Sequence, residues 1–368
     1  MKLLFISMSP RGPLDPWHPL PAGPEALDTT GDGVYLWPRE TRALYAAVGL
    51  AGLGHQIVFC TRNWSARYAG VEFRPVKDFA RQVLTGGPWD CVLTFGTPEP
   101  LVALRGGACV YDFGPDDVAV GTNLRAHIHA VLVQSETQGY RIPGRLITST
   151  SAIPYHVLPG GFDAATYRAA RQAMSADRRR IGYWSRPGPL LCRLLEWVGT
   201  TERGRQVEVF GLRPDLDVAW IERCLARGIV VHPPLAPKTL AERQAMCGVA
   251  VVDTAEGEFS RATVEALALG CATIVGDHAV NVEYWGELVR RSSTLVEALP
   301  HALHDPTPSV AECWKVVANW TWAHAAEELR DTIMLARTMA GTVGHDEMMH
   351  ATTGIPLLVA RAHVTNAG

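Results

Sequence analysis

The sequence has no large excess of charge of either sign, no paired cysteines and no long hydrophobic run. It carries 34 Lys and Arg against 37 Asp and Glu, a formal net charge of −3, so no global field favours nucleic acid or an anionic membrane. The eight cysteines are spaced singly, and several lie inside apolar runs, where a free thiol behaves as a small hydrophobic group. This pattern indicates a reducing compartment instead of a disulfide framework, and we expect a cytoplasmic protein.

The N-terminal residues and the length of the chain limit the possible architectures. The first residues, MKLLFISMSP, contain an apolar run that is too short for a signal peptide and predicts a buried first strand. No stretch approaches the roughly 20 apolar residues of a membrane-spanning helix, so we expect no transmembrane segment. A chain of 368 residues exceeds one typical hydrophobic core and predicts two domains.

Short apolar runs of strand length alternate with helical patterns in the first half of the chain. The runs that we predict as buried strands are 3–6, 55–61, 89–96, 108–113 and 130–135. Helices between successive strands imply a parallel, doubly wound α/β sheet. Ligands of such sheets bind beside the carboxyl ends of the strands, and Asp112 lies at one of these ends.

The clearest single unit lies between residues 249 and 277. Four apolar residues, 249–252, predict a buried strand, and an acidic, glycine-containing loop follows them. Ser260 is placed to begin a helix that Gly270 ends, and residues 272–275 predict the next strand. The loop therefore lies at the carboxyl end of a strand, where the helix N-terminus offers free N–H groups and a partial positive charge.

A nucleotide-sugar donor suits this combination of groups. The helix N–H groups and a nearby cation such as Arg261 would neutralise its diphosphate, and the carboxylates of Glu256, Glu258 and Glu265 would accept hydrogen bonds from ribose and sugar hydroxyls. The alternative is an ordinary strand–helix–strand unit whose acidic residues only solvate the loop.

Residues 256–259 (EGEF) and 265–275 (EALALGCATIV) resemble the C-terminal donor site of family-four glycosyltransferases. In that family an acidic residue and a Gly/Phe turn precede a second glutamate that heads the segment EAMAxGxPVV. Glu265 matches this second glutamate. The family usually has seven residues between its two glutamates, whereas Glu258 leaves six and Glu256 leaves eight, so either of them can be the first.

Weaker resemblances extend over nearly the whole chain. Residues 52–61 resemble the segment that opens the family's acceptor domain, 156–163 the segment at its domain junction, and 319–329 the helix that ends its second domain. The family also has Gly-Arg and then a lysine that together grip the donor diphosphate. Arg186 matches the arginine, but the lysine position falls within Pro-Gly-Pro-Leu, and Arg193 is the nearest later cation.

The resemblance implies an α/β fold of two Rossmann-like, doubly wound domains that face a cleft, the GT-B arrangement. We expect residues 1–160 to bind the acceptor and 161–335 to bind the nucleotide sugar, with 336–368 packing back on the first domain. The implied reaction transfers a hexosyl or pentosyl group from a UDP- or GDP-sugar with retention of configuration. It needs no metal and no other cofactor, because helix N–H groups and arginine would stabilise the departing diphosphate.

The candidate site residues follow from this reaction. His18 and Asp112 are candidate catalytic residues on the acceptor side, and a structural role fits each of them as well. His232 ends a predicted strand at the level of the donor base, which it can face, or it can pack at the strand edge. The donor-binding candidates are Arg186, Arg193, His232, Glu256, Glu258, Phe259, Ser260, Arg261 and Glu265.

The sequence fits two other functions as well. The missing lysine and the shifted glutamate spacing fit a degenerate relative that serves as a binding or scaffold subunit. A sugar-nucleotide epimerase is the other alternative, because fold does not fix chemistry. The acceptor is open too: a small molecule, a glycan, a lipid-linked glycan, a protein or a modified nucleic-acid base all fit the nearly balanced charge of the first domain.

Overall fold

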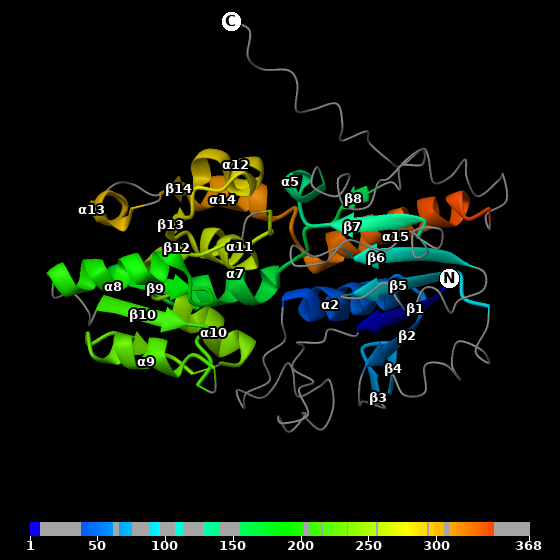
Figure 1. Cartoon of the computed structure of the whole chain (residues 1–368), viewed down its shortest axis with the longest axis horizontal. Coiled ribbons are helices and arrows are strands. Elements are labelled where there is room, and N and C mark those ends of the chain that lie inside the picture. The colour runs from blue at the N-terminus through cyan, green and yellow to red at the C-terminus, as the bar shows by residue number, and fades with distance from the viewer. Residues whose placement is uncertain are drawn as a thin grey trace, which may run out of the picture.

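A computed structural model describes most of the chain, and two domains lie side by side in it (Figure 1). The residues that it describes are 1–7, 38–61, 66–75, 88–95, 107–112, 128–139, 155–201, 206–214, 216–233, 235–254, 257–292, 294–304 and 309–341. Each domain is built around its own sheet. Among these residues no helix is long and apolar enough to cross a membrane.

The N-terminal domain contains an eight-stranded sheet with the order β3-β4-β2-β1-β5-β6-β7-β8, in which β3 alone runs antiparallel to its neighbour. The strands are β1 (Lys2–Ser7), β2 (Gln56–Thr61), β3 (Ala66–Tyr68), β4 (Val71–Pro75), β5 (Cys91–Phe95), β6 (Ala108–Asp112), β7 (Ala130–Val133) and β8 (Tyr155–Val157). The five predicted strands of this half of the chain are confirmed. Their apolar side chains are buried on both faces, as parallel strands require.

Helices α2 (Pro38–Gly52) and α15 (Trp322–Met339) cover one face of this sheet. The rings of Phe59, Phe5 and Phe95 stack along that face, with centroids 5.7–5.8 Å apart. Buried residues of both helices belong to the same core, so the last described helix of the chain completes the first domain. Figure 1 shows α15 beside the N-terminal sheet.

The C-terminal domain contains a six-stranded parallel sheet with the order β11-β10-β9-β12-β13-β14. Its strands are β9 (Asp177–Trp184), β10 (Val207–Phe210), β11 (Val230–Val231), β12 (Cys247–Val252), β13 (Ala272–Val275) and β14 (Arg290–Arg291). Its helices are α7 (Ala164–Ala173), α8 (Pro189–Thr201), α9 (Val218–Leu225), α10 (Pro237–Gln244), α11 (Arg261–Leu269), α12 (Ala279–Trp285), α13 (Leu295–His304) and α14 (Val310–Val317), with the 3₁₀-helix η4 (Gly286–Leu288) after α12.

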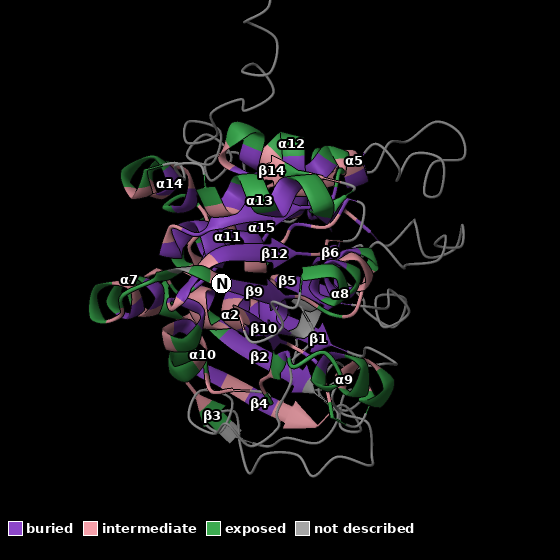
Figure 2. Ribbon diagram, turned by 90° about the vertical axis from the view of Figure 1, so that its left-hand side faces the viewer, coloured by how far each residue is buried: buried purple, intermediate pink, exposed green. Residues whose placement is uncertain are grey.

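Helices lie on both faces of the C-terminal sheet and bury two separate cores. One core joins α7, α10, α11 and α14 to the sheet, and the other joins α8 and α13 to its opposite face. Figure 2 shows the buried strands between helices whose outer sides are exposed. The two domains therefore have the doubly wound architecture that the sequence predicts.

The chain crosses between the domains at two adjacent points. Phe162 and Thr321 form a parallel bridge, and the Phe162 N–H donates to the Trp320 carbonyl at 2.9 Å. Because α15 packs into the N-terminal core from Ala325 onward, the chain returns to the first domain near residue 322, earlier than the expected residue 336.

We expect Gly161→Ala to destabilise the protein by about 1–3 kcal/mol, because the backbone at the start of α15 leaves no room for a side chain. A Cβ built at Gly161 would lie 2.6 Å from the Trp322 nitrogen. Gly199→Ala is the matched control, since no atom lies within 4 Å of its added Cβ and alanine favours the helix by up to about 1 kcal/mol. Denaturant unfolding of the two variants should therefore show shifts of opposite sign.

Candidate functional site

The unit β12–turn–α11–β13 has the predicted form. Ser260 is the N-cap of α11, and its hydroxyl accepts a hydrogen bond from the Thr263 N–H at 3.2 Å. Gly270 ends the helix in the left-handed conformation, with φ 77°, which a glycine adopts without steric cost. Strands β12 and β13 pair in parallel, so the turn after β12 lies at the carboxyl edge of the sheet.

Glu265 lies on α11 and is 8% exposed. Its carboxylate Oε1 is 3.2 Å from Arg261 Nε, one helical turn away. Burial raises the pKa of Glu265, while Arg261 and a hydrogen bond from Tyr167 act in the opposite direction. A buried carboxylate loses favourable hydration, and one exposed guanidinium does not restore all of it. A buried carboxylate whose lost hydration is only partly offset by a neighbouring cation is typical of functional sites.

The turn itself is described from Gly257 onward, so Glu256 lies outside the described residues. Gly257 has φ 82°, and Glu258 is half-buried. The Phe259 ring is buried, and its centroid lies 5.2–5.5 Å from those of Tyr284, Trp285 and Trp320. Phe259 therefore anchors the turn by packing, and Glu258 is the described acidic residue of the turn.

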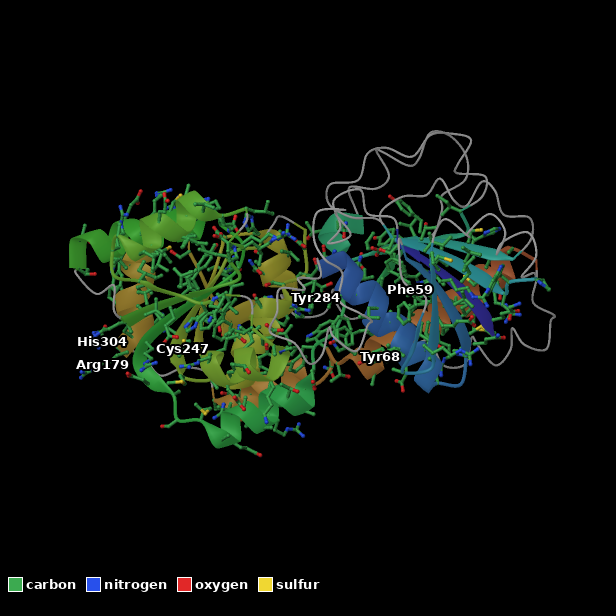
Figure 3. All side chains as sticks on the ribbon, turned by 90° about the horizontal axis from the view of Figure 1, so that it is seen from below. Phe59, Tyr68, Arg179, Cys247, Tyr284 and His304 are labelled. Atoms are coloured by element: carbon green, nitrogen blue, oxygen red, sulfur yellow. The ribbon has the colours of Figure 1, made fainter. Side chains whose placement is uncertain are left out.

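The turn contacts the N-terminal domain. The Ser135 hydroxyl donates to the Gly257 carbonyl at 2.8 Å, and the Phe259 N–H donates to Gln134 Oε1 at 3.2 Å. The Tyr284 hydroxyl donates to the Gln134 carbonyl at 2.6 Å. Figure 3 shows Tyr284 on the side of the C-terminal domain that faces the N-terminal domain. The candidate donor site thus lies where the two domains meet.

Asp253 is a further residue of this edge, and no sequence motif marks it. It follows β12, and its Oδ2 accepts hydrogen bonds from the Tyr183 hydroxyl at 2.9 Å and the Leu190 N–H at 3.0 Å. A Cβ added at Gly188 would lie 2.5 Å from that oxygen. Burial raises the pKa of Asp253. Because this carboxylate occupies the start of α8, it takes the place of an anion there.

The arginine candidates lie around the same edge. Arg186 is exposed in the loop after β9, and its carbonyl also lies close to the Tyr183 hydroxyl. Arg193 lies half-buried on α8. The Arg261 side chain is 45% exposed at the start of α11. Strands β9 and β12 are neighbours, so Arg186 and Arg261 follow adjacent strands, and their contact with a donor diphosphate stays a prediction.

His232 packs inside the C-terminal domain. Its ring stacks on Phe210 at 4.5 Å, and its Nε2 lies 2.6 Å from Glu208 Oε2. Arg180 Nη1 donates to the other oxygen of Glu208 at 2.8 Å. The hydrogen bond with His232 and the charge of Arg180 lower the pKa of Glu208. The edge-packing alternative of the sequence analysis therefore describes the environment of His232, and its contact with a donor base stays a prediction.

We expect Glu208→Gln to reduce the free energy of unfolding by about 1–3 kcal/mol at pH 7. A lowered folded-state pKa contributes stability above the unfolded-state pKa of about 4.3, and this contribution is lost as the pH falls through the folded-state pKa. The difference from wild type should therefore shrink below about pH 4. Denaturant unfolding at pH 7 and pH 3.5 measures it, with exposed Glu222→Gln as control; a difference independent of pH would contradict the ion pair.

The two acceptor-side candidates are not brought together by the described residues. His18 lies outside them. Asp112 is 1% exposed and forms an ion pair with Arg42 of α2. Arg42 Nη1 also donates to the Leu158 carbonyl at 3.3 Å, just before the domain crossing. This environment fits a structural ion pair, and catalysis by Asp112 stays a prediction.

Within the described ranges no three His, Cys, Asp or Glu side chains gather into a group that could hold a metal ion. The described cysteines are free, and all of them except the half-buried Cys192 are buried. Metal independence stays a prediction of the family resemblance.

Two doubly wound domains, joined by adjacent crossings and with α15 returned to the first domain, define a GT-B fold, and the predicted fold class is confirmed. No protein-family model and no curated protein matches the sequence.

Solved structures share this fold at low sequence identity. AviGT4, a glycosyltransferase involved in avilamycin A biosynthesis, is similar with a TM-score of 0.61 and 13% identity over 93% of this chain and 98% of that chain. HepE of Anabaena in complex with UDP-glucose is similar with a TM-score of 0.53 and 16% identity over 96% of this chain and 100% of that chain. The N-terminal domain of a Candida albicans trehalose-6-phosphate phosphatase is similar with a TM-score of 0.62 and 11% identity over 91% of this chain and 97% of that chain.

Proposed function

We propose that the protein is a glycosyltransferase that moves a hexosyl or pentosyl group from a nucleotide sugar to an acceptor. The observation that carries the proposal is the buried carboxylate of Glu265, paired with Arg261 at the start of α11 beside the turn that contains Glu258. In a GT-B fold this turn lies where a donor would contact both domains. AviGT4 and HepE, which are a glycosyltransferase and a UDP-glucose complex, support the same function.

In the proposed reaction the bond between the anomeric carbon and the diphosphate oxygen breaks. The nucleoside diphosphate takes the bonding electrons, and an acceptor oxygen forms the new bond and gives up its proton to the departing diphosphate. Arg186, Arg261 and the first N–H groups of α11 are placed to stabilise the negative charge on the diphosphate. Glu265 would accept hydrogen bonds from the ribose hydroxyls and Glu258 from those of the sugar. Retention of configuration and independence from metal are parts of this proposal.

Isothermal titration with UDP, GDP, UDP-glucose and GDP-mannose tests the donor. UDP is the first choice, because HepE is bound to UDP and to UDP-glucose in solved structures. We expect one nucleoside diphosphate to bind. Its sugar-linked form should be consumed when an acceptor is present, and mass spectrometry should show the added sugar on the acceptor. Consumption that yields free sugar or an epimer without transfer would support the epimerase alternative instead.

The scaffold alternative also has an observation in its favour. Asp253 places a carboxylate at the start of α8, in the region where the resemblance expects a lysine to grip the diphosphate. A negative group there weakens the attraction for a diphosphate. If no nucleotide and no nucleotide sugar binds, this alternative replaces the glycosyltransferase. Asp253→Asn, which keeps a similar shape and removes the charge, is then expected to bring UDP binding into the measurable range, because it removes the repulsion.

A further inference from the structure

Gln134 and Ser135 form a corner between β7 and α5 (Glu136–Gly139) of the N-terminal domain, and this corner hydrogen-bonds to the Gly257–Phe259 turn of the C-terminal domain. Ser135 donates to the Gly257 carbonyl and Gln134 accepts from the Phe259 N–H. Gln134 and Ser135 are 6% and 0% exposed, so water competes little for either hydrogen bond. The two bonds fall on either side of Glu258.

The corner is itself held in place. The Gln134 N–H donates to Gln138 Oε1 at 2.6 Å, and the Gln138 N–H donates to the Ser135 hydroxyl at 3.0 Å. The Tyr284 hydroxyl binds the Gln134 carbonyl. Both side chains therefore meet the turn from a preorganised backbone, which is the arrangement that positions a neighbouring group accurately.

The turn has little regular structure of its own. Residues 257–259 lie between β12 and the N-cap of α11 and belong to neither a helix nor a strand, so no sheet ladder or helical repeat holds them. Hydrogen bonds to the carbonyl before Glu258 and to the N–H after it restrict its backbone on both sides. The backbone on both sides of Glu258 is thus held in part by residues of the other domain.

We propose that Gln134 and Ser135 are positioning residues that hold the Gly257–Phe259 turn of the donor site from the opposite domain. This inference rests on the proposed glycosyltransferase function. The donor site is then complete only when the two domains meet in the arrangement described above, and loss of either hydrogen bond loosens the turn without removing any group that touches the donor.

Matched variants separate the hydrogen bond from the bulk of the side chain. Gln134→Met removes the acceptor for the Phe259 N–H at similar volume, and Gln134→Glu keeps an acceptor oxygen. Ser135→Ala and Ser135→Thr form a second pair. Thr137→Val is the control, because it removes a 3.0 Å hydrogen bond to Glu283 across the same domain contact without touching the turn.

Hydrogen exchange of the protein without nucleotide gives the first measurement. We expect Gln134→Met to speed exchange of the Phe259 amide by about tenfold or more, while Gln134→Glu and Thr137→Val stay near the wild-type rate. Ser135→Ala should also speed exchange of the Phe259 amide, and Ser135→Thr should return its exchange rate to near the wild-type value. An unchanged exchange rate in both Gln134→Met and Ser135→Ala would overturn the proposal.

Calorimetry with UDP and UDP-glucose gives the second measurement. We expect Gln134→Met to weaken UDP-glucose binding by about tenfold and to affect UDP less, because Glu258 faces the sugar in the proposed site. Gln134→Glu and Thr137→Val should remain within about threefold of wild type. A loosened turn with unchanged UDP-glucose affinity overturns the positioning role. A wild-type protein that binds no nucleotide sugar defeats the proposed function instead, and the exchange rates still decide whether the corner holds the turn.

Discussion

Glu265→Gln is expected to weaken UDP-glucose binding by about a hundredfold, while the free energy of unfolding at pH 7 stays the same or rises. A hundredfold loss corresponds to about 2.7 kcal/mol. This is the magnitude of one or two hydrogen bonds from ribose hydroxyls to a charged acceptor. Glutamine keeps the shape of Glu265 and one carbonyl oxygen, so the substitution removes the charge and little of the packing.

The stability of the same variant should depend on pH in a defined direction. Burial raises the pKa of Glu265 in the folded state, so the folded protein holds the ionised carboxylate at a cost. The contribution of Glu265 to stability is therefore greatest below its unfolded-state pKa of about 4.3 and falls as the pH rises through the folded-state pKa. The glutamine variant should gain stability relative to wild type between about pH 4 and pH 7.

Calorimetry with UDP-glucose and denaturant unfolding at pH 4.5 and pH 7 measure both effects on one protein. Glu242→Gln on α10 is the control, because Glu242 lies 4.0 Å from the exposed Lys238 at the surface and such pairs contribute little. Undiminished affinity together with a loss of stability would make Glu265 a packing residue and would remove the main support for the donor site.

The parts of this site that the sequence predicts are those with local causes. The apolar run of β12, the Ser260 cap and the Gly270 stop are each set by residues within the unit. The strands with continuous apolar runs are predictable for the same reason. The short β3 and β4 escaped prediction because they form an edge hairpin in which charged Arg67 and Glu72 lie opposite each other.

The parts that escaped prediction depend on residues far apart in the chain. Gln134 and Ser135 lie 125 and 122 positions from their partners in the turn, and no local pattern specifies such pairs. The apolar stripe of α15 predicts a helix, but it does not say which domain the helix covers. Asp253 follows a buried strand and has an ordinary turn-forming residue type, so only the position of α8 shows that its carboxylate caps that helix.

The second large effect concerns the ion pair of Arg42 and Asp112. Arg42→Met is expected to destabilise the N-terminal domain by about 3–5 kcal/mol, because it leaves the carboxylate of Asp112 buried without the guanidinium. It also removes the donor to the Leu158 carbonyl, at the segment that leads into the first domain crossing. Arg67→Met is the control, since the Arg67 side chain is 85% exposed and should change stability by at most about 0.5 kcal/mol.

Hydrogen exchange locates the effect, because amides of β1 and β5 report the N-terminal core and amides of β12 report the other domain. Exchange should accelerate in β1 and β5 first. The double variant Arg42→Met/Asp112→Leu should recover stability to within about 2 kcal/mol of wild type, since a buried ion pair can be replaced by apolar groups more readily than it can be halved. The single variant Asp112→Asn separates this structural role from catalysis: lost transferase turnover with unchanged unfolding would make Asp112 a catalytic residue, whereas a comparable loss of stability identifies it as the anchor of α2 beneath the domain crossing.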